Sequence, residues 1–234
     1  MIGLGTLINC AGIILGGVVG FLFGKYMSER VREGLNMACG ITVLFIGISG
    51  AMEQMLLGGK SMFVVICIAL GTLIGELINI EGWFEKFGEW LKVKTGNAKD
   101  KDFVNAFVTA SLTVCIGTMA IVGAIQDGLS GDFSILATKA ILDLIIIIVM
   151  TCSMGKGCIF SALPVFVFEG AITLLAKLIS PVVTEAAQNN ISLVGSILIF
   201  CVGVNLVWGK KVRVANMLPS VFVAAGAAFL PFSF

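Results

Sequence analysis

A lysine and an aspartate within one apolar run are the residues of this chain best suited to do chemistry. Lys139 and Asp143 lie four positions apart in the run 134–154, so a helix places both side chains on one face. An aspartate in the middle of a bilayer costs about 3 kcal/mol on insertion scales and must face a partner or water. The spacing predicts a coupling site, in which Asp143 alternates between Lys139 and a proton or cation. The alternative is an ion pair that only holds helices together.

Glu169 is a second carboxylate within an apolar run, 157–176, where Pro164 precedes it. Proline removes a backbone hydrogen bond and kinks a helix, which frees carbonyl groups for new partners. A carboxylate beside such a kink suits a cation site. The alternative is a protonated glutamate that hydrogen-bonds to a neighbouring helix.

Two threonines extend the candidate site into the run 103–126. Thr109 and Thr113 recur at a four-residue spacing with Asn105 and Gly117, which indicates a polar stripe along one helix face. The stripe could line a hydrophilic path. Equally, each hydroxyl could bond to the carbonyl four residues back.

Further polar residues join the candidates for binding a solute or ion. The turn 126–134 is expected to place Gln126 and Asp127 where cations enter, although Asp127 could serve only the turn, and Asp132 or Ser134 is expected to cap the next helix. The remaining candidates are Glu76, as a gate or a side chain that reaches water, and the amides Asn9 and Asn205. Neither amide has a local partner in the sequence, and each could bond across the bundle or to a ligand.

The composition indicates a membrane protein. Of 234 residues, 58% are hydrophobic and 12% are charged, whereas charged residues make up about a quarter of a typical soluble domain. With a mean hydropathy of +1.08, soluble enzymes, disordered tails and nucleic-acid binders are excluded.

The chain also lacks the residues that common cofactor chemistry needs. Histidine is absent and the net charge is +1, so no imidazole acid or base and no basic nucleic-acid surface is expected. The seven cysteines are scattered without a C-x-x-C motif and are interpreted as small core residues. The sequence therefore predicts no enzyme, no metal site and no cofactor.

The fold class predicted is an all-α, polytopic membrane bundle that forms one domain over 1–234. A bilayer core about 30 Å thick needs about 20 apolar helical residues. Eight runs qualify: 1–24, 34–52, 61–80, 103–126, 134–154, 157–176, 186–209 and 214–234. Runs that are apolar at every position argue against barrel strands, which alternate.

Charge placement predicts the orientation. With eight spans and an external N-terminus, twelve of the fifteen lysines and arginines fall on the cytoplasmic side, as the positive-inside rule requires. We therefore expect a multi-pass protein of the inner membrane with both termini outside. The segment 81–94 has aromatic residues at helical spacing opposite charged ones, which predicts an amphipathic helix at the cytoplasmic membrane surface or, alternatively, a partner-docking helix.

Two further patterns concern how the spans pack. Spans 1–3 and 6–8 would cross in opposite senses, which suggests the inverted repeat found in many secondary transporters. A ridge of glycines at four-residue spacing lets another helix approach closely, either within the chain or in a homodimer. Its members are Gly12, Gly16, Gly20 and Gly24.

Short motifs occur along nearly the whole chain: Met1-Ile2-Gly3 with Asn9, Leu70-Gly71-Thr72-Leu73-Ile74-Gly75-Glu76 with Ile80-Glu81, Phe107-Val108-Thr109-Ala110-Ser111, Gly123-Ala124-Ile125-Gln126-Asp127-Gly128, Gly131-Asp132, Thr138-Lys139, Leu142-Asp143 and Ser161-Ala162-Leu163-Pro164. Together they resemble the domain-of-unknown-function 554 family of prokaryotic inner-membrane proteins. The resemblance implies a transporter of unsettled activity. It also implies glutamine at position 169 in many relatives, so Glu169 is a departure.

These patterns favour a secondary transporter of a small solute or ion, coupled to a proton or cation through the carboxylates within the membrane. An ion channel would need the same polar lining without coupling. A non-transporting assembly or sensor protein would use the helix 81–94 and the glycine ridge instead. The partners expected are the lipid bilayer and a small solute or cation, with no nucleic acid.

Overall fold

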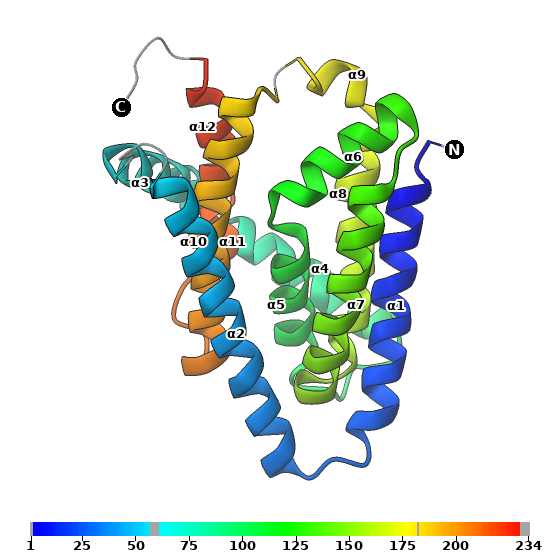
Figure 1. The fold of residues 1–234 in the computed structure, drawn as a ribbon. Helices are drawn as coiled ribbons and strands as arrows, with labels where there is room; N and C mark the ends of the chain where they lie inside the picture. The colour runs from blue at the N-terminus through cyan, green and yellow to red at the C-terminus, as the bar shows by residue number, and fades with distance from the viewer. Residues whose placement is uncertain (1, 57–60, 182, 230–234) are drawn as a thin grey trace.

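The computed structural model describes residues 2–56, 61–181 and 183–229, and every regular element in them is a helix, which confirms the predicted fold class (Figure 1). The elements are α1 Leu4–Gly24, α2 Glu29–Leu56, α3 Ser61–Ile78, α4 Ile80–Lys94, α5 Phe103–Cys115, α6 Thr118–Ser130, α7 Ser134–Met154, η1 Lys156–Ser161, α8 Ala162–Leu174, α9 Ala176–Ile179, α10 Glu185–Trp208, α11 Val214–Met217 and α12 Pro219–Ala227.

The number of spans differs from the eight predicted. Among the described residues, six helices are long and apolar enough to cross a membrane: α1, α2, α3, α7, η1 continued by α8, and α10. The pair α5 and α6 would be a seventh, although it bends by 63°. The run 214–234 yields only the short helical stretch Val214–Ala227, with 230–234 outside the described residues, and this stretch falls short of the about 20 residues that a span needs. The inverted repeat, which depended on eight spans, stays a prediction.

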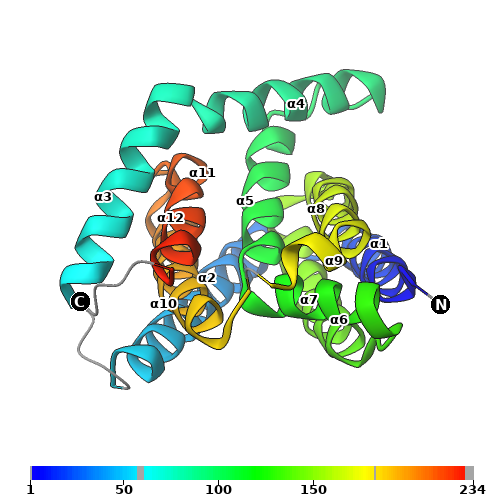
Figure 2. The same cartoon turned by 90° about the horizontal axis from the view of Figure 1, so that it is seen from above.

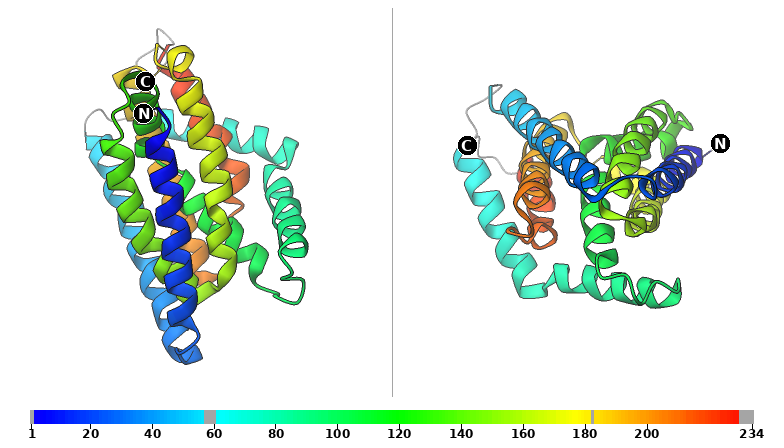
Figure 3. Two further views of the ribbon diagram at one scale, coloured as in Figure 1. Left: turned by 90° about the vertical axis from the view of Figure 1, so that its right-hand side faces the viewer. Right: turned by 90° about the horizontal axis from the view of Figure 1, so that it is seen from below.

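The long helices pack in two groups with α5 between them. In the α1/α7 group, α1 lies along α7 and contacts η1, α6 and α8, as the side view shows (Figure 3). In the α2/α10 group, α10 lies along α2, and α11 and α12 pack on α3. Seen from above, α5 stands between the two groups and α4 runs across one end of it, along the upper edge of the view (Figure 2). Because α5 contacts α7, α8 and α10, it connects both groups.

The glycine ridge of α1 faces α7 of the same chain. A methyl group added at Gly16 would lie 2.6 Å from the carbonyl oxygen of Leu144, and one at Gly20 would lie 2.5 Å from that of Ile148. Real side chains do not approach backbone that closely, so glycine is required for this contact. The ridge is thus covered internally. A homodimer stays a prediction and would have to use another surface.

The amphipathic segment 81–94 is helical, as predicted, and forms most of α4. Asn79, in the left-handed region at φ 57°, caps its first turn by accepting from the Gly82 amide. Its buried Leu91 and Gly88 face α5, where a methyl group at Gly88 would meet Phe107 at 3.0 Å. The position of this helix at the membrane surface stays a prediction.

Candidate functional site

A cluster of buried charges lies in the α1/α7 group. Lys139 is in direct contact with Asp143, one turn further along α7, and its Nζ lies 3.7 Å from Oε1 of Glu169 on α8. The three side chains are 7%, 7% and 1% exposed. Asn9 on α1 completes the cluster because its Nδ2 donates to Oε1 of Glu169 at 2.8 Å. These four residues are called the charge cluster below.

The structure therefore brings together four of the residues that the sequence singled out. Asn9 lies 160 positions from its partner Glu169, so only the packing of α1 against α8 unites them. Two polar atoms of the cluster, Oε2 of Glu169 and Oδ1 of Asn9, have no hydrogen-bond partner within the part of the chain that the structure describes. Burying a polar atom without a partner is costly, so both atoms are available to a proton or an ion.

A helix break lies beside the charge cluster. α5 ends at Cys115, Ile116 and Gly117 are extended, and α6 begins at Thr118. The last carbonyl groups of a helix have no partner within the helix, and Lys139 Nζ donates to one of them, the Val114 oxygen, at 2.7 Å. A cation there also complements the negative end of the helix dipole. The sequence predicted one unbroken span over 103–126, so the break is a correction, with Gly117 as its only signal.

The charge cluster holds one lysine and two carboxylates. If all three groups are ionised, the cluster carries one net negative charge, and no other basic side chain within the described ranges forms an ion pair with Asp143 or Glu169. A net charge is expensive to bury. One proton or one monovalent cation would neutralise the cluster.

Asp127 and Gln126 lie apart from the charge cluster, in the last turns of α6, because the helix continues to Ser130 where the sequence predicted a turn from residue 126. Asp127 is fully buried, and its Oδ2 accepts from the Gly5 amide at 3.0 Å. That amide belongs to the first turn of α1, where unpaired N–H groups and the helix dipole favour a carboxylate. The structure thus gives Oδ2 of Asp127 a partner, whereas Oδ1 is buried without one among the described residues.

Gln126 stabilises the turn that follows. Its Nε2 donates to Oδ2 of Asp132 at 2.7 Å, while Oδ1 of Asp132 accepts from the Ser134 amide at 3.0 Å. Hydrogen bonds from the Ser134 hydroxyl and amide, with that from Gln126, lower the pKa of Asp132. The N-cap of α7 is Phe133, which makes no side-chain cap bond, so neither Asp132 nor Ser134 is the N-cap predicted. Asp132 lies one residue before it and accepts from the first amide of the helix.

We expect Asp127→Ala to lower the free energy of unfolding by about 1–2 kcal/mol, the usual cost of losing a helix cap. Asp127→Asn should cost less, because the amide oxygen can still accept from Gly5. Thermal and denaturant unfolding of the purified protein in detergent measure both effects. If Asp127→Asn instead left the unfolding temperature unchanged but abolished transport, Asp127 would be an ion contact and not a cap.

The remaining predicted site residues lie on α5 itself and in the α2/α10 group. The Thr113 hydroxyl donates to the Thr109 carbonyl at 2.8 Å. This is the second of the two alternatives for these hydroxyls, a bond to the carbonyl four residues back. Asn205 holds the loop after α10 because its Oδ1 accepts from the Lys211 and Val212 amides, both at 2.8 Å. Glu76 on α3 accepts from Arg213 at 3.0 Å. None of these bonds involves the charge cluster.

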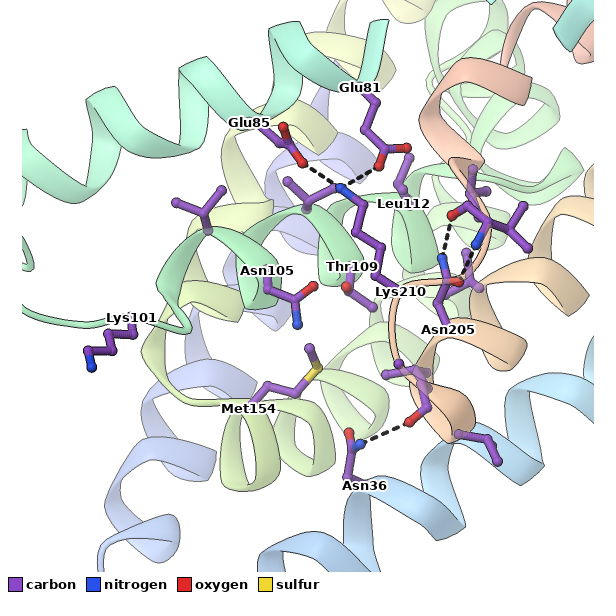
Figure 4. Close-up of a pocket in the computed structure, with 18 of the residues that line it drawn as sticks. Asn36, Glu81, Glu85, Lys101, Asn105, Thr109, Leu112, Met154, Asn205 and Lys210 are labelled. Atoms are coloured by element: carbon purple, nitrogen blue, oxygen red, sulfur yellow. Dashed lines mark hydrogen bonds and ion pairs between the residues drawn. The ribbon is translucent and has the colours of Figure 1, made fainter. Parts of the chain in front are cut away.

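A cavity of about 670 Å³ lies between α2, α4, α5 and α10. Thr109 and Asn205 line it, together with Asn36, Asn105, Met154 and the ion-paired Lys210 (Figure 4). Lys139, Asp143 and Glu169 do not line it. The sequence does not predict this cavity, because hydropathy and helical spacing do not show that the helix 81–94 packs over α5. The four-residue spacing of Glu81 and Glu85 was the available signal.

Lys210 connects α4 to the loop after α10. Its Nζ lies 2.6 Å from Oε1 of Glu81 and also contacts Glu85. Burial by itself lowers the pKa of Lys210, but hydrogen bonds to Glu81 and Glu85 outweigh that effect and raise the pKa. The lysine therefore stays charged at neutral pH and keeps both carboxylates at the mouth of the cavity.

Comparison with known proteins extends the resemblance seen in the sequence. The model of the family described as "Protein of unknown function (DUF554)" matches residues 4–229. The chain is 29% identical over 230 residues to the "Uncharacterized membrane protein YdfK" of Bacillus subtilis (strain 168), covering 98% of this chain and 97% of the relative. It is 28% identical over 225 residues to the "Uncharacterized protein YqgA" of Escherichia coli (strain K12), covering 94% of each. No solved structure gave a significant match.

Proposed function

The chain belongs to the DUF554 family, and we propose that it is a secondary transporter of a small solute or ion, coupled to a proton or cation through Asp143. The observation that carries the proposal is the position of Lys139 between two buried carboxylates, beside the break between α5 and α6. Broken helices next to buried charges form the ion and substrate sites of many transporters.

The geometry supports an exchange of partners by Lys139. When a proton or cation neutralises Asp143, the ammonium group loses its nearest counter-charge, and Oε1 of Glu169 is 3.7 Å away to receive it. Asn9 orients Glu169 for this exchange through its 2.8 Å hydrogen bond. Because Lys139 also holds the Val114 carbonyl at the end of α5, its movement would change the packing of the broken helix.

The excess of negative charge favours this role over a purely structural ion pair. A pair that only joins helices needs one lysine and one carboxylate, and a second buried carboxylate adds a cost that scaffolding does not require. The burial of the cluster also favours a carrier over a channel, because an open pore would keep these side chains in contact with water.

The proposed orientation follows from the basic loops. We infer an inner-membrane protein with the loop 25–28 and residues 209–213 on the cytoplasmic side, as the positive-inside rule predicts. In agreement with termini on one side, α1 begins and α12 ends toward the same end of the molecule (Figure 1).

The test is proton movement in proteoliposomes with an entrapped pH-sensitive dye and an imposed gradient of Na⁺, K⁺ or ethanolamine. We expect the wild-type protein to move protons against at least one of these gradients and Asp143→Asn to abolish that movement. Glu169→Gln keeps an acceptor for Asn9 but removes the second carboxylate that Lys139 can reach, so it should slow transport without abolishing it.

Asp132→Asn is the matched control, because it makes the same carboxylate-to-amide change in an exposed turn outside the charge cluster. Its flux should equal that of the wild type. Unchanged flux in Asp143→Asn would refute the coupling role. Single-channel currents in planar bilayers, without coupled proton movement, would show that the protein is a channel and not a carrier.

A further inference from the structure

The cavity between α2, α4, α5 and α10 presents polar groups that the fold does not use. Asn105 and the Thr109 hydroxyl project from α5 toward its interior (Figure 4), and neither side chain makes a hydrogen bond with any described residue. On the α2 wall, Nδ2 of Asn36 donates to the Leu206 carbonyl at 3.1 Å, while its Oδ1 is buried without a partner. A ligand in the cavity would therefore meet the unused polar groups of Asn105 and Thr109 on the α5 wall.

The mouth of the cavity carries excess negative charge. Glu81 and Glu85 share the single ammonium group of Lys210, which leaves one net negative charge. The other two charged residues of the lining, Glu89 and Lys101, have opposite signs, so the lining as a whole also carries one net negative charge. The electrostatics at the mouth thus favour a ligand with one positive charge.

The size and lining of the cavity restrict the ligand further. Its volume of about 670 Å³ lies in the usual range of small-molecule sites, about 300–1,000 Å³. Aliphatic side chains such as Leu112 and Val202, with the thioether of Met154, form the apolar part, and the lining includes no aromatic ring. The cavity lacks the stacking surface that a ring-bearing ligand or a quaternary ammonium group commonly uses.

We propose that this cavity is a binding site for a small aliphatic organic cation that carries one primary ammonium group and a hydroxyl or carbonyl group. The ammonium group would bind Glu85 and Glu81 in competition with Lys210, and the oxygen function would bind Asn105 and Thr109. The identification of this ligand as the transported solute rests on the proposed function. Thr109 and Leu112 line the cavity on the same helix whose Val114 carbonyl binds Lys139, so α5 connects the solute site with the charge cluster.

The test uses three probes of equal carbon number and different charge: ethanolamine as cation, glycine as zwitterion and glycolate as anion. Binding to the purified wild-type protein in detergent is measured by isothermal titration and by the shift in unfolding temperature. We expect saturable binding of ethanolamine, with glycine and glycolate at least tenfold weaker.

Variants assign the binding to this cavity. Glu85→Gln removes the net charge at the mouth and should weaken ethanolamine binding about tenfold, while Asn105→Ala and Thr109→Val should each weaken it about threefold to tenfold, as expected for lost hydrogen bonds. Thr113→Val is the matched control, because the Thr113 hydroxyl is already bonded to the Thr109 carbonyl and lies outside the lining. This control should bind ethanolamine as the wild type does.

The outcomes separate this inference from the proposed function. Stronger binding of glycine or glycolate, no binding of any probe, or equal effects of Thr109→Val and Thr113→Val would overturn the site. Ethanolamine binding that persists in Asp143→Asn while coupled proton movement is lost would support both. Ethanolamine binding without any coupled proton movement in the wild type would support the binding site and refute the proposed transport. Coupled proton movement without ethanolamine binding would support transport and refute the binding site.

Discussion

Lys139→Met is expected to lower the free energy of unfolding by about 3–5 kcal/mol, the typical cost of removing one partner of a buried ion pair. The substitution leaves Asp143 and Glu169 buried without a counter-charge and also frees the Val114 carbonyl. Asp143→Asn should cost much less, because Lys139 can still pair with Glu169. Thermal unfolding in detergent, followed by tryptophan fluorescence, measures this order of stability.

The double variant Lys139→Met/Asp143→Asn separates scaffolding from function. Removing both charges should recover much of the stability that Lys139→Met loses, since one uncompensated carboxylate is gone. The double variant should nevertheless fail to move protons in proteoliposomes. A double variant that transports like the wild type would show that the pair only joins helices. One as unstable as Lys139→Met alone would contradict the charge balance proposed for the cluster.

Gly16→Val is the second substitution with a large expected effect, a loss of about 3 kcal/mol or more in the free energy of unfolding. Overpacking in a tight core typically costs about 1–3 kcal/mol, and here the first added carbon would already lie 2.6 Å from the Leu144 carbonyl oxygen. Backbone cannot move aside as a flexible side chain can. The helices α1 and α7 would have to separate along much of their contact.

Gly170→Ala is the control for this prediction. Gly170 also lies within a membrane helix, but a methyl group there meets no atom within 4 Å, so stability should be unchanged or rise by up to about 1 kcal/mol through better helix propensity. The measurement is again thermal unfolding, combined with the molar mass in detergent. If Gly16→Val kept its stability but converted a dimer into monomers, the ridge would join two chains and the internal contact described above would be wrong.

Local properties of the sequence were sufficient for the fold class and for part of the site. Hydrophobic length and the cost of burying charge depend on residues close together in the chain, so the helical membrane bundle was predictable. Lys139 and Asp143 were also predictable as a pair, because four-residue spacing on a helix brings side chains together whatever surrounds them. The same reasoning predicted the amphipathic helix that ends at Lys94.

Hydropathy could not predict which helix faces which, because these helices are apolar on nearly every side. The contact of Asn9 with Glu169 joins residues 160 positions apart, and the partner of Asp127 is an amide at the start of α1. Hydropathy also treats a broken helix and a straight one alike, so the break at Gly117 and the shortness of Val214–Ala227 were not foreseen.

The sequence alone therefore determined that this protein is an α-helical membrane protein with a lysine and an aspartate on one buried helix face. Only the tertiary structure decided that Glu169 joins them, that the glycine ridge is covered by α7, and that Glu81 and Glu85 line a polar cavity. The physical reason is the range of the interactions. Insertion energy and helical periodicity act along the chain, whereas the close approach at Gly16 and the sharing of Lys139 depend on backbone geometry between distant segments.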